Sequence, residues 1–200
     1  MANYCYNYIT FNSDDAEKIN KIVKFFNSYS QFETTTEWGD SVINGDYEID
    51  DRIENSFNKY GAKWFYGDID VSNDGLELGV SGDSAWSPME ALVGGLCYTF
   101  GVDGRIEYSE PGCNFGGRCS FDNKGVINEF IQMSYSEWMY HSNGSEWVNE
   151  SLYYDLESQI DDYDTFDEFI KEYPFINNPE HIESLRYAFH ELKKLLINNE

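Results

Sequence analysis

The chain opens with an alternation of apolar and polar positions. Between Tyr4 and Phe11, the apolar residues Cys5, Ile9 and Phe11 share one parity. A period of two is typical of a β-strand with one buried face, so we expect the first strand here. The other parity, and therefore the other face, holds Tyr4, Tyr6, Tyr8 and Thr10.

A helical pattern follows this strand. Acidic residues from Asp14 to Glu17 suit a helix N-terminus, where the helix dipole favours negative charge. Apolar residues then recur at three- and four-residue steps, which predicts a buried stripe of Ile19, Ile22, Val23 and Phe26. Residues 28–60 keep no sustained period, and we expect an irregular or short-helical insertion there.

A hairpin and a second helix are predicted next. Strand-like runs at 63–71 and 76–81 flank Ser72-Asn73-Asp74-Gly75, a sequence typical of a tight turn. Beyond the hairpin, Ser87, Pro88 and Glu90 fit the N-cap, the first position and the capping box of a helix. We expect Trp86 to anchor this turn onto the core. The buried stripe of the helix is expected to be Met89, Leu92, Val93, Leu96 and Phe100.

One further strand, Arg105–Ser109, completes the order β-α-β-β-α-β. This order is typical of a ferredoxin-like domain, in which two split βαβ units put both helices on one face of an antiparallel sheet. The glycine-rich run 111–118 is expected to be a tight loop, and 119–121 with 126–135 an extra hairpin. The predicted fold class is α+β: a ferredoxin-like antiparallel sheet with an extra hairpin, followed by a helical, acidic C-terminal segment.

The last third of the chain reads as helical. Thr165 and Glu168 form a capping box, and Asn178-Pro179 begins a final helix. We expect its near-heptad stripe to pack against the first domain, with a homodimer seam as the alternative; the stripe is Ile182, Leu185, Phe189, Leu192 and Leu196. Two domains are predicted: a ferredoxin-like α+β domain, residues 1–135, and an acidic helical C-terminal region, residues 136–200, which packs on the first domain.

Charge changes the functional picture. The 200 residues carry 13 Lys and Arg against 37 Asp and Glu, a net charge of −24. Such a chain repels phosphate backbones and anionic lipids, so we expect neither direct nucleic-acid binding nor membrane binding. Solubility alone is one explanation, and a basic protein partner, such as a nucleic-acid-binding enzyme, is the other.

The acidic residues concentrate between Gly125 and Ile170, where eleven of them occur without one Lys or Arg. Aromatic residues are interleaved with them, a mixture suited to binding a basic partner. An ordinary solvated helix surface is the alternative. The candidate partner-binding residues are Glu146, Glu150, Asp155, Glu157, Asp161, Asp162, Asp164, Asp167, Trp147, Tyr154 and Tyr163.

Catalytic and metal-binding patterns are hard to find. Four cysteines form no C-x-x-C pair, and the three histidines make no metal-binding spacing. Residues 70–81 match only the first half of a calcium loop, with Ser81 at the position that requires Glu. The cluster from Asp161 to Asp167 could hold a divalent cation, although a solvated acidic surface is favoured. We therefore expect no catalytic residue, cofactor or metal.

The N-terminal sequence also bears on location. Met-Ala-Asn-Tyr-Cys has neither the basic start nor the apolar run of a signal peptide. Together with the unpaired cysteines, this predicts a reduced, cytoplasmic protein.

Three short, ordered motifs stand out in the first part of the chain. They are the start Met1–Ile9, the turn Ala85-Trp86-Ser87-Pro88, and Glu107–Gly112 followed by Phe115-Gly116-Gly117. These motifs resemble the YubB-like family of phage and plasmid proteins, and the resemblance implies a bacterial host cell. The similarity covers about the first 135 residues. Tyr4 stands where the family has Trp, and only one Pro follows Trp86, which implies a divergent member. The resemblance implies a ferredoxin-like domain and a mobile-element origin, and it supplies no catalytic residue.

Together these observations predict a non-enzymatic protein of a mobile element. It would bind and inhibit a host defence or nucleic-acid-handling protein through an acidic, DNA-mimic-like surface, as an anti-CRISPR or another anti-defence inhibitor does. Two alternatives remain open. One is a structural or oligomerisation module, and the other is an enzyme whose distant carboxylates converge in the fold, with or without a metal.

Overall fold

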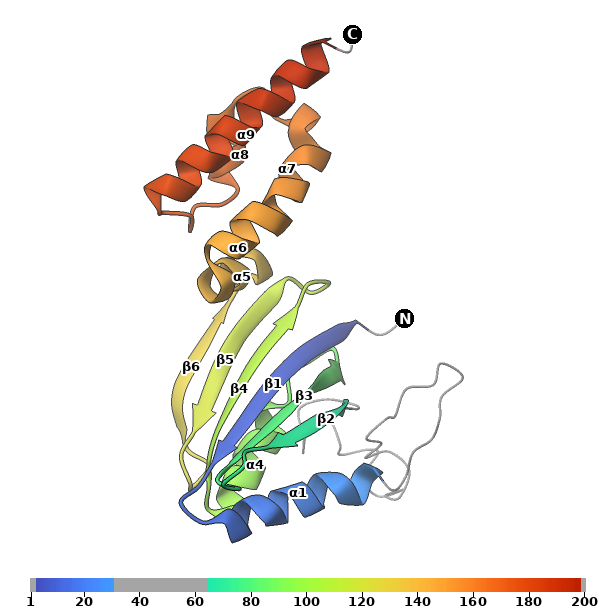
Figure 1. The fold of residues 1–200 in the computed structure, drawn as a ribbon, viewed down its shortest axis with the longest axis vertical. Coiled ribbons are helices and arrows are strands. Elements are labelled where there is room, and N and C mark those ends of the chain that lie inside the picture. The colour runs from blue at the N-terminus through green and yellow to red at the C-terminus, as the bar shows by residue number, and fades with distance from the viewer. Residues whose placement is uncertain (1–2, 31–64, 199–200) are drawn as a thin grey trace. The chain divides into compact units, whose positions relative to one another are not determined.

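The computed structural model describes residues 3–30 and 65–198 (Figure 1). The insertion expected at 28–60 lies almost entirely outside the described residues. The chain divides into two compact units, Met1–Tyr135 and Ser136–Glu200, and each is described by itself. The packing of the second unit on the first stays a prediction.

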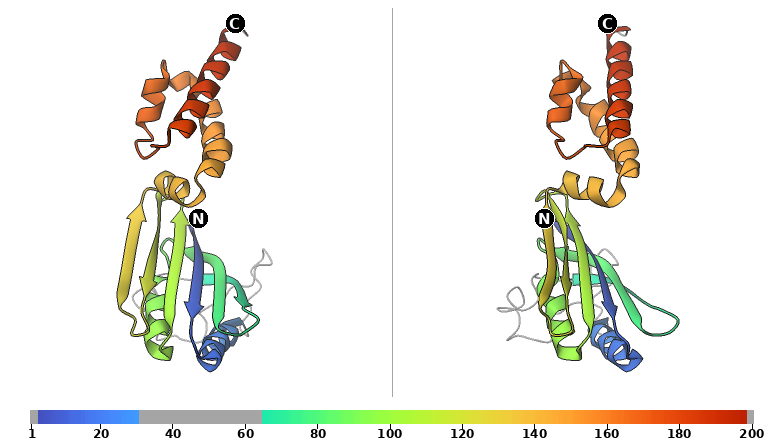
Figure 2. Two further views of the ribbon diagram at one scale, coloured as in Figure 1. Left: turned by 60° about the vertical axis from the view of Figure 1, so that its left-hand side comes forward. Right: turned by 90° about the vertical axis from the view of Figure 1, so that its left-hand side faces the viewer.

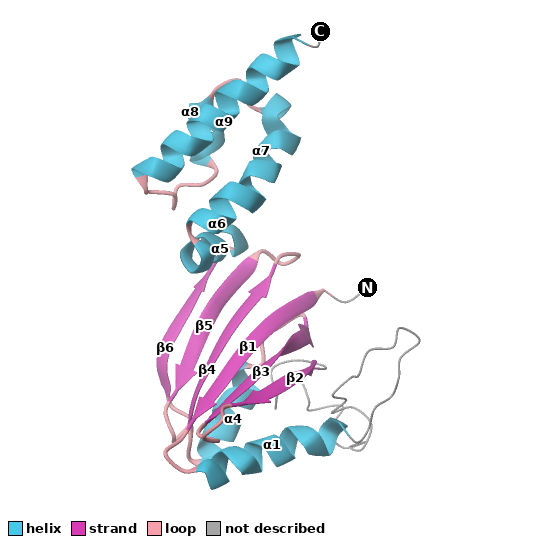
Figure 3. Cartoon of the chain, in the orientation of Figure 1, coloured by secondary structure: helices cyan, strands magenta, loops and turns pink. Residues whose placement is uncertain are grey.

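Unit 1 is built on one antiparallel sheet with the order β2-β3-β1-β4-β5-β6 (Figure 3). The α+β class and the antiparallel sheet are confirmed. Its elements are β1 (Tyr4–Asn12), α1 (Ala16–Ser30), β2 (Phe65–Val71), β3 (Glu77–Ala85), α4 (Glu90–Phe100), β4 (Asp103–Glu110), β5 (Phe115–Phe121) and β6 (Ile127–Met133).

The two faces of the sheet differ in what covers them. Helices α1 and α4 pack on one face (Figure 2), where Ile9 and Phe11 join the α1 and α4 stripes in a buried core. The apolar parity of β1 and the stripe of α1 are thus confirmed. The opposite face, called the outer face below, carries the other parity of β1, including Tyr6 and Tyr8.

The start of α4 differs from the prediction. Helix α4 begins at Glu90, and no side chain of its own turn caps it. Instead, the buried Asn7 of β1 supplies the cap, because its Oδ1 accepts a hydrogen bond from Met89 N at 3.0 Å. Asn7 Nδ2 donates to Cys5 O at 2.7 Å and to Ser84 Oγ at 2.8 Å. The prediction of a local capping box at Ser87 was therefore wrong.

The turn before α4 also corrects the expected role of Trp86. Trp86 has φ +69°, a conformation that only glycine adopts at no cost, and its residue surface is 48 % exposed. Its backbone N–H donates to Asn3 O at 3.1 Å. The residue fixes the turn through its backbone, and its ring does not anchor the core.

Glycines are part of the sheet where a loop was expected. Phe115, Gly116 and Gly117 belong to β5, and a Cβ on Gly117 would collide with Ile131 O of β6. The prediction of a loop over 111–118 was therefore wrong for residues 115–118, which belong to β5, because these glycines permit close pairing of strands. In α4, a Cβ on Gly94 would lie 2.8 Å from Phe121 Cε1, so this glycine allows α4 to pack closely on β5.

Unit 2 is helical. It comprises α5 (Tyr135–Asn143), α6 (Ser145–Trp147), a π-helical turn η1 (Val148–Leu152), α7 (Tyr153–Gln159), a 3-10 turn η2 (Ile160–Asp162), α8 (Phe166–Lys171) and α9 (Pro179–Asn198). The capping box at Thr165 and Glu168 is confirmed, and Asn178 Oδ1 caps α9 by accepting from Glu180 N.

The apolar stripe of α9 is used within unit 2. Leu185 and Phe189 are each 2 % exposed and belong to one core with Leu152, Leu156 and Phe169. The packing of this stripe against the first domain stays a prediction, as does the alternative homodimer seam. Leu185 and Phe189 themselves are already buried within unit 2.

The cap that Asn7 provides gives the first testable prediction. Asn7→Ala should lower the free energy of unfolding by at least about 2 kcal/mol, because it leaves the Met89 N–H and the Ser84 hydroxyl without this buried partner. The measurement is urea denaturation followed by circular dichroism. Asn12→Ala, at the exposed end of the same strand, is the control and should be nearly neutral. Equal losses in both variants would contradict the assignment.

Candidate functional site

The predicted binding residues lie on the helical turns from α6 to η2, on the short connection from Tyr163 to Thr165 and on the first turn of α8; this stretch is named here the acidic segment (Glu146–Asp167). Its apolar residues recur at four-residue steps and are buried: Val148, Leu152, Leu156 and Ile160. This stripe holds the segment on the core of unit 2. The described carboxylates are all exposed, namely Glu146, Asp155, Glu157, Asp161, Asp162, Asp164 and Asp167. The side chain of Glu150 lies outside the described part of the structure.

Cations compensate little of this charge. Among the described side chains, the segment has one ion pair, between Asp167 Oδ1 and Arg186 Nη1 of α9 at 3.6 Å. The same guanidinium lies 4.4 Å from the centroid of the Phe166 ring. Carboxylates spaced along successive turns without cations between them produce a negative potential that reaches into solvent. The arrangement is suited to attracting a basic surface.

The three predicted aromatic residues separate into different roles. Trp147 is 4 % exposed, with its ring 6.3 Å from Tyr140 and 6.2 Å from Phe175. Tyr163 is half-buried and packs edge-on against Phe169 at 5.4 Å. Only Tyr154 is largely exposed, at 69 %. Assigning Trp147 to a partner surface was wrong, because its ring belongs to the core.

A signal in the sequence could have located Trp147 correctly. It directly precedes Val148, the first member of the four-residue apolar repeat that runs to Ile160. A large ring beside such a stripe is more often core than surface.

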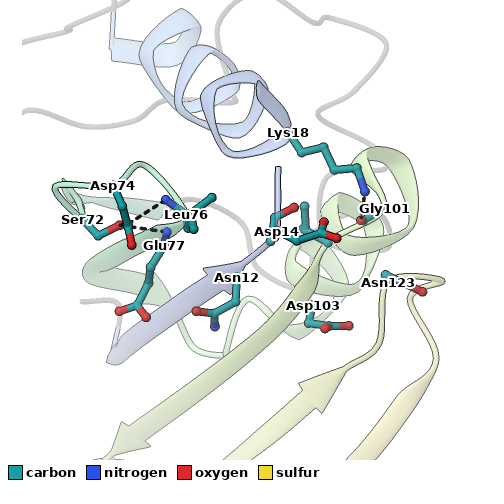
Figure 4. A pocket seen from close by; sticks show the side chains of 12 residues that line it. Asn12, Asp14, Lys18, Ser72, Asp74, Leu76, Glu77, Gly101, Asp103 and Asn123 are labelled. Atoms are coloured by element: carbon teal, nitrogen blue, oxygen red, sulfur yellow. Dashed lines mark hydrogen bonds between the residues drawn. The ribbon is translucent and has the colours of Figure 1, made fainter. Parts of the chain in front are cut away.

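A second candidate is a hollow at one end of the sheet in unit 1, about 600 Å³ in volume. Figure 4 shows the turn from Ser72 to Glu77 on one side of it and Lys18 with Gly101 on the other. Lys18 Nζ donates to Gly101 O at 3.0 Å. The remaining charged lining is anionic: Asp14, Asp74, Glu77 and Asp103. No pattern in the sequence indicates this hollow, because strand order alone brings these distant turns together.

Asp74, the residue that suggested half a calcium loop, has a local structural role. Its carboxylate accepts hydrogen bonds from Ser72 Oγ at 2.6 Å and Leu76 N at 3.1 Å, which lower its pKa. These bonds lock the β2–β3 turn. Across residues 3–30 and 65–198, no group of three or more His, Cys, Asp or Glu is placed to hold a metal ion.

The thiols in the core are poor nucleophiles. Burial raises the pKa of Cys5 and of Cys97 to about 12, and that of Cys119 to about 11. A thiol with such a pKa is protonated at neutral pH and does not attack electrophiles. These three cysteines therefore serve as packing residues.

Glu90 and Tyr108 form the most perturbed pair in the interior of unit 1. Burial raises the pKa of Glu90, and the Tyr108 hydroxyl lowers it only in part. Burial, followed by the nearby Glu90 carboxylate, raises the pKa of Tyr108. Glu90 Oε1 and the Tyr108 hydroxyl are buried, yet neither completes a hydrogen bond of good geometry. Ionised Glu90 is thus a cost to the stability of the fold.

This pair predicts a pH-dependent variant. Because the folded-state pKa of Glu90 lies above its unfolded value, Glu90→Gln should raise the free energy of unfolding at neutral pH. The gain should shrink as pH falls toward the usual Glu range, where the carboxyl is protonated in both states. Urea denaturation from about pH 8 to about pH 4 measures it. Glu77→Gln, at an exposed position, is the control, and a Glu90→Gln protein less stable at every pH would contradict the assignment.

The burial of Trp147 predicts a second difference. Trp147→Ala should lower the free energy of unfolding of unit 2 by about 3–5 kcal/mol, because it leaves a cavity among packed rings. Tyr154→Ala, five residues before Gln159 on the exposed surface of α7, should change it by less than about 0.5 kcal/mol. Urea denaturation of the full chain, monitored by far-ultraviolet circular dichroism, measures both changes in the free energy of unfolding. If Trp147→Ala left the free energy of unfolding unchanged, the assignment of this ring to the core would be contradicted.

Within the described residues, no helix combines the length and apolar character needed to cross a membrane. Comparison with known proteins finds no relative: no protein-family model, no curated protein and no solved structure matches the chain. The resemblance to the YubB-like family stays a prediction.

Proposed function

We propose that this chain is a non-enzymatic inhibitor that binds a basic, nucleic-acid-handling host protein through the acidic segment. The observation that carries the proposal is the set of exposed carboxylates between Glu146 and Asp167, held on a packed helical core with no Lys or Arg in the segment. A nucleic-acid-binding groove is lined with cations, and carboxylates on a folded surface offer it the charge that phosphates otherwise supply.

Rigidity supports this proposal. A flexible acidic tail would lose conformational entropy on binding, whereas carboxylates fixed by a buried stripe lose little. Long-range attraction also accelerates association, and this acceleration decreases with ionic strength. The complex is therefore expected to form quickly and to weaken in salt.

We further propose that unit 1 is a ferredoxin-like domain. Its supports are the chain order β-α-β-β-α-β, the sheet order β2-β3-β1-β4 within the larger sheet, and the packing of α1 and α4 in one core. Strands β5 and β6 extend that arrangement. Together with the motifs that resemble YubB-like proteins, this favours a mobile-element protein, and we propose an anti-defence role such as that of an anti-CRISPR.

The proposed interaction is tested by affinity capture with the immobilised full chain. A basic, nucleic-acid-binding protein should be captured from bacterial extract and released by duplex DNA or by raised salt. The purified captured protein should then lose its nucleic-acid-binding activity when the chain is added. Replacing Asp161, Asp162 and Asp164 by Asn should reduce its affinity at least about tenfold, since three carboxylates of the interface lose their charge.

A charge-matched control separates local from net-charge effects. Asp14→Asn, Glu180→Gln and Glu183→Gln change the net charge equally at exposed positions outside the acidic segment. This control should bind as the parent does. Binding that is insensitive to salt and DNA, or that falls equally in both triple variants, would reject the proposal.

A further inference from the structure

A row of tyrosines lies at the centre of the outer face of unit 1. Tyr6 and Tyr8 are 50 % and 47 % exposed, and Tyr4 continues the row toward the N-terminus. Strand β1 that carries them is flanked by β3 and β4. Alternate residues of a strand lie about 6.7 Å apart, so neighbouring rings leave room for a planar group over or beside each. The row is thus a half-exposed aromatic surface on a rigid, central strand.

The charges around this row are unevenly distributed. On the β2–β3 side, Asp68, Asp70 and Glu77 are exposed on the outer face, opposite Ser81, Gly79 and Asn12 in the strand register. In the described structure none of these three carboxylates has an ion pair. That side of the outer face is therefore anionic.

On the β4–β6 side both arginines of the outer face are already paired. Arg105 is paired with Glu107, and Arg118 Nη2 lies 2.9 Å from Glu129 Oε1. The hydrogen bond from Arg118 lowers the pKa of Glu129. Tyr8 lies directly opposite Glu107 in the register, so one carboxylate stands beside the row. The two arginines of the outer face are thus occupied and leave it with an excess of negative charge.

We infer that the outer face is a docking site for an arginine-containing basic segment of a partner protein. Guanidinium groups stack on tyrosine faces and pair with carboxylates. The outer face offers both, because Asp68 lies on the same rung of the sheet as Tyr8, across Ser81 of β3. The same carboxylates repel phosphates, which disfavours a nucleic acid at this surface. The site belongs to unit 1 and is distinct from the acidic segment, so the inference does not depend on the proposed function.

A preference for arginine over lysine in the bound peptide tests whether the tyrosine rings take part in binding. The probes are two fluorescein-labelled peptides of equal length and charge, one with arginines and one with lysines, added to the full chain at low salt. The arginine peptide should bind more tightly, because the planar guanidinium stacks on tyrosine while the ammonium mainly contributes charge. Replacing Tyr6 and Tyr8 by Ser should weaken arginine-peptide binding roughly fivefold or more and should abolish the preference.

Matched variants keep this test interpretable. Tyr6→Phe with Tyr8→Phe retains the ring faces and should retain the preference, and thermal melting of each variant reports whether it folds. Tyr98→Ser, at a 73 % exposed tyrosine of α4, should also retain it. Loss of the preference in Tyr98→Ser, or its survival in the folded Tyr6→Ser/Tyr8→Ser protein, would overturn the inference.

Nuclear magnetic resonance separates this site from the acidic segment. Titration of the arginine peptide into the ¹⁵N-labelled full chain should shift the amide signals of Tyr6 and Tyr8, including in the variant with Asn at 161, 162 and 164. Shifts confined to the acidic segment would overturn the inference and leave the proposed function standing. Tighter binding of oligothymidine than of the arginine peptide at the tyrosine row would also overturn it.

Discussion

The arrangement of unit 1 depends on a few hydrogen bonds made by one buried amide. Asn7 is fully buried, and it joins its own strand, the end of β3 and the first turn of α4. A helix end without a cap leaves unpaired N–H groups, which are costly when they are buried. By meeting this requirement from β1, Asn7 fixes where α4 begins relative to the sheet. Its removal would loosen strand and helix together.

The electrostatic state of the chain imposes a second constraint. With a net charge of −24, repulsion between carboxylates opposes compaction, and the described ion pairs lie at exposed or half-exposed positions where each contributes little. Two separate apolar cores must offset that repulsion. A partner that brings cations relieves it, which links the acidic surfaces to binding. The composition that weakens the isolated chain therefore favours the proposed complex.

Local patterns in the sequence predicted much of this structure. The period of β1, the turn from Ser72 to Gly75 and the capping box at Thr165 depend on neighbouring residues, and each is observed. The cap of α4 could not be predicted in this way, because Ser87 fits the local rule while the true acceptor is 82 residues away in sequence. Fold topology, which no local pattern specifies, decides such contacts.

The candidate site shows the same division. The exposure of the carboxylates could be predicted from their polarity. The burial of Trp147 depends on its place beside the apolar helical stripe, which the number of nearby charges does not indicate. The hollow of unit 1 depends on strand order, and no local sequence motif predicts it. Residue chemistry was thus easier to predict than residue position.

The central place of β1 has a consequence for how the protein folds during synthesis. This strand is made well before both of its partners, β3 and β4, which begin at Glu77 and at Asp103. Contacts between distant parts of the sequence slow folding, because long loops must close before they form. Until β4 leaves the ribosome, one backbone edge of β1 lacks its pairing strand. The nascent chain is therefore most prone to aggregation in the interval before that strand appears.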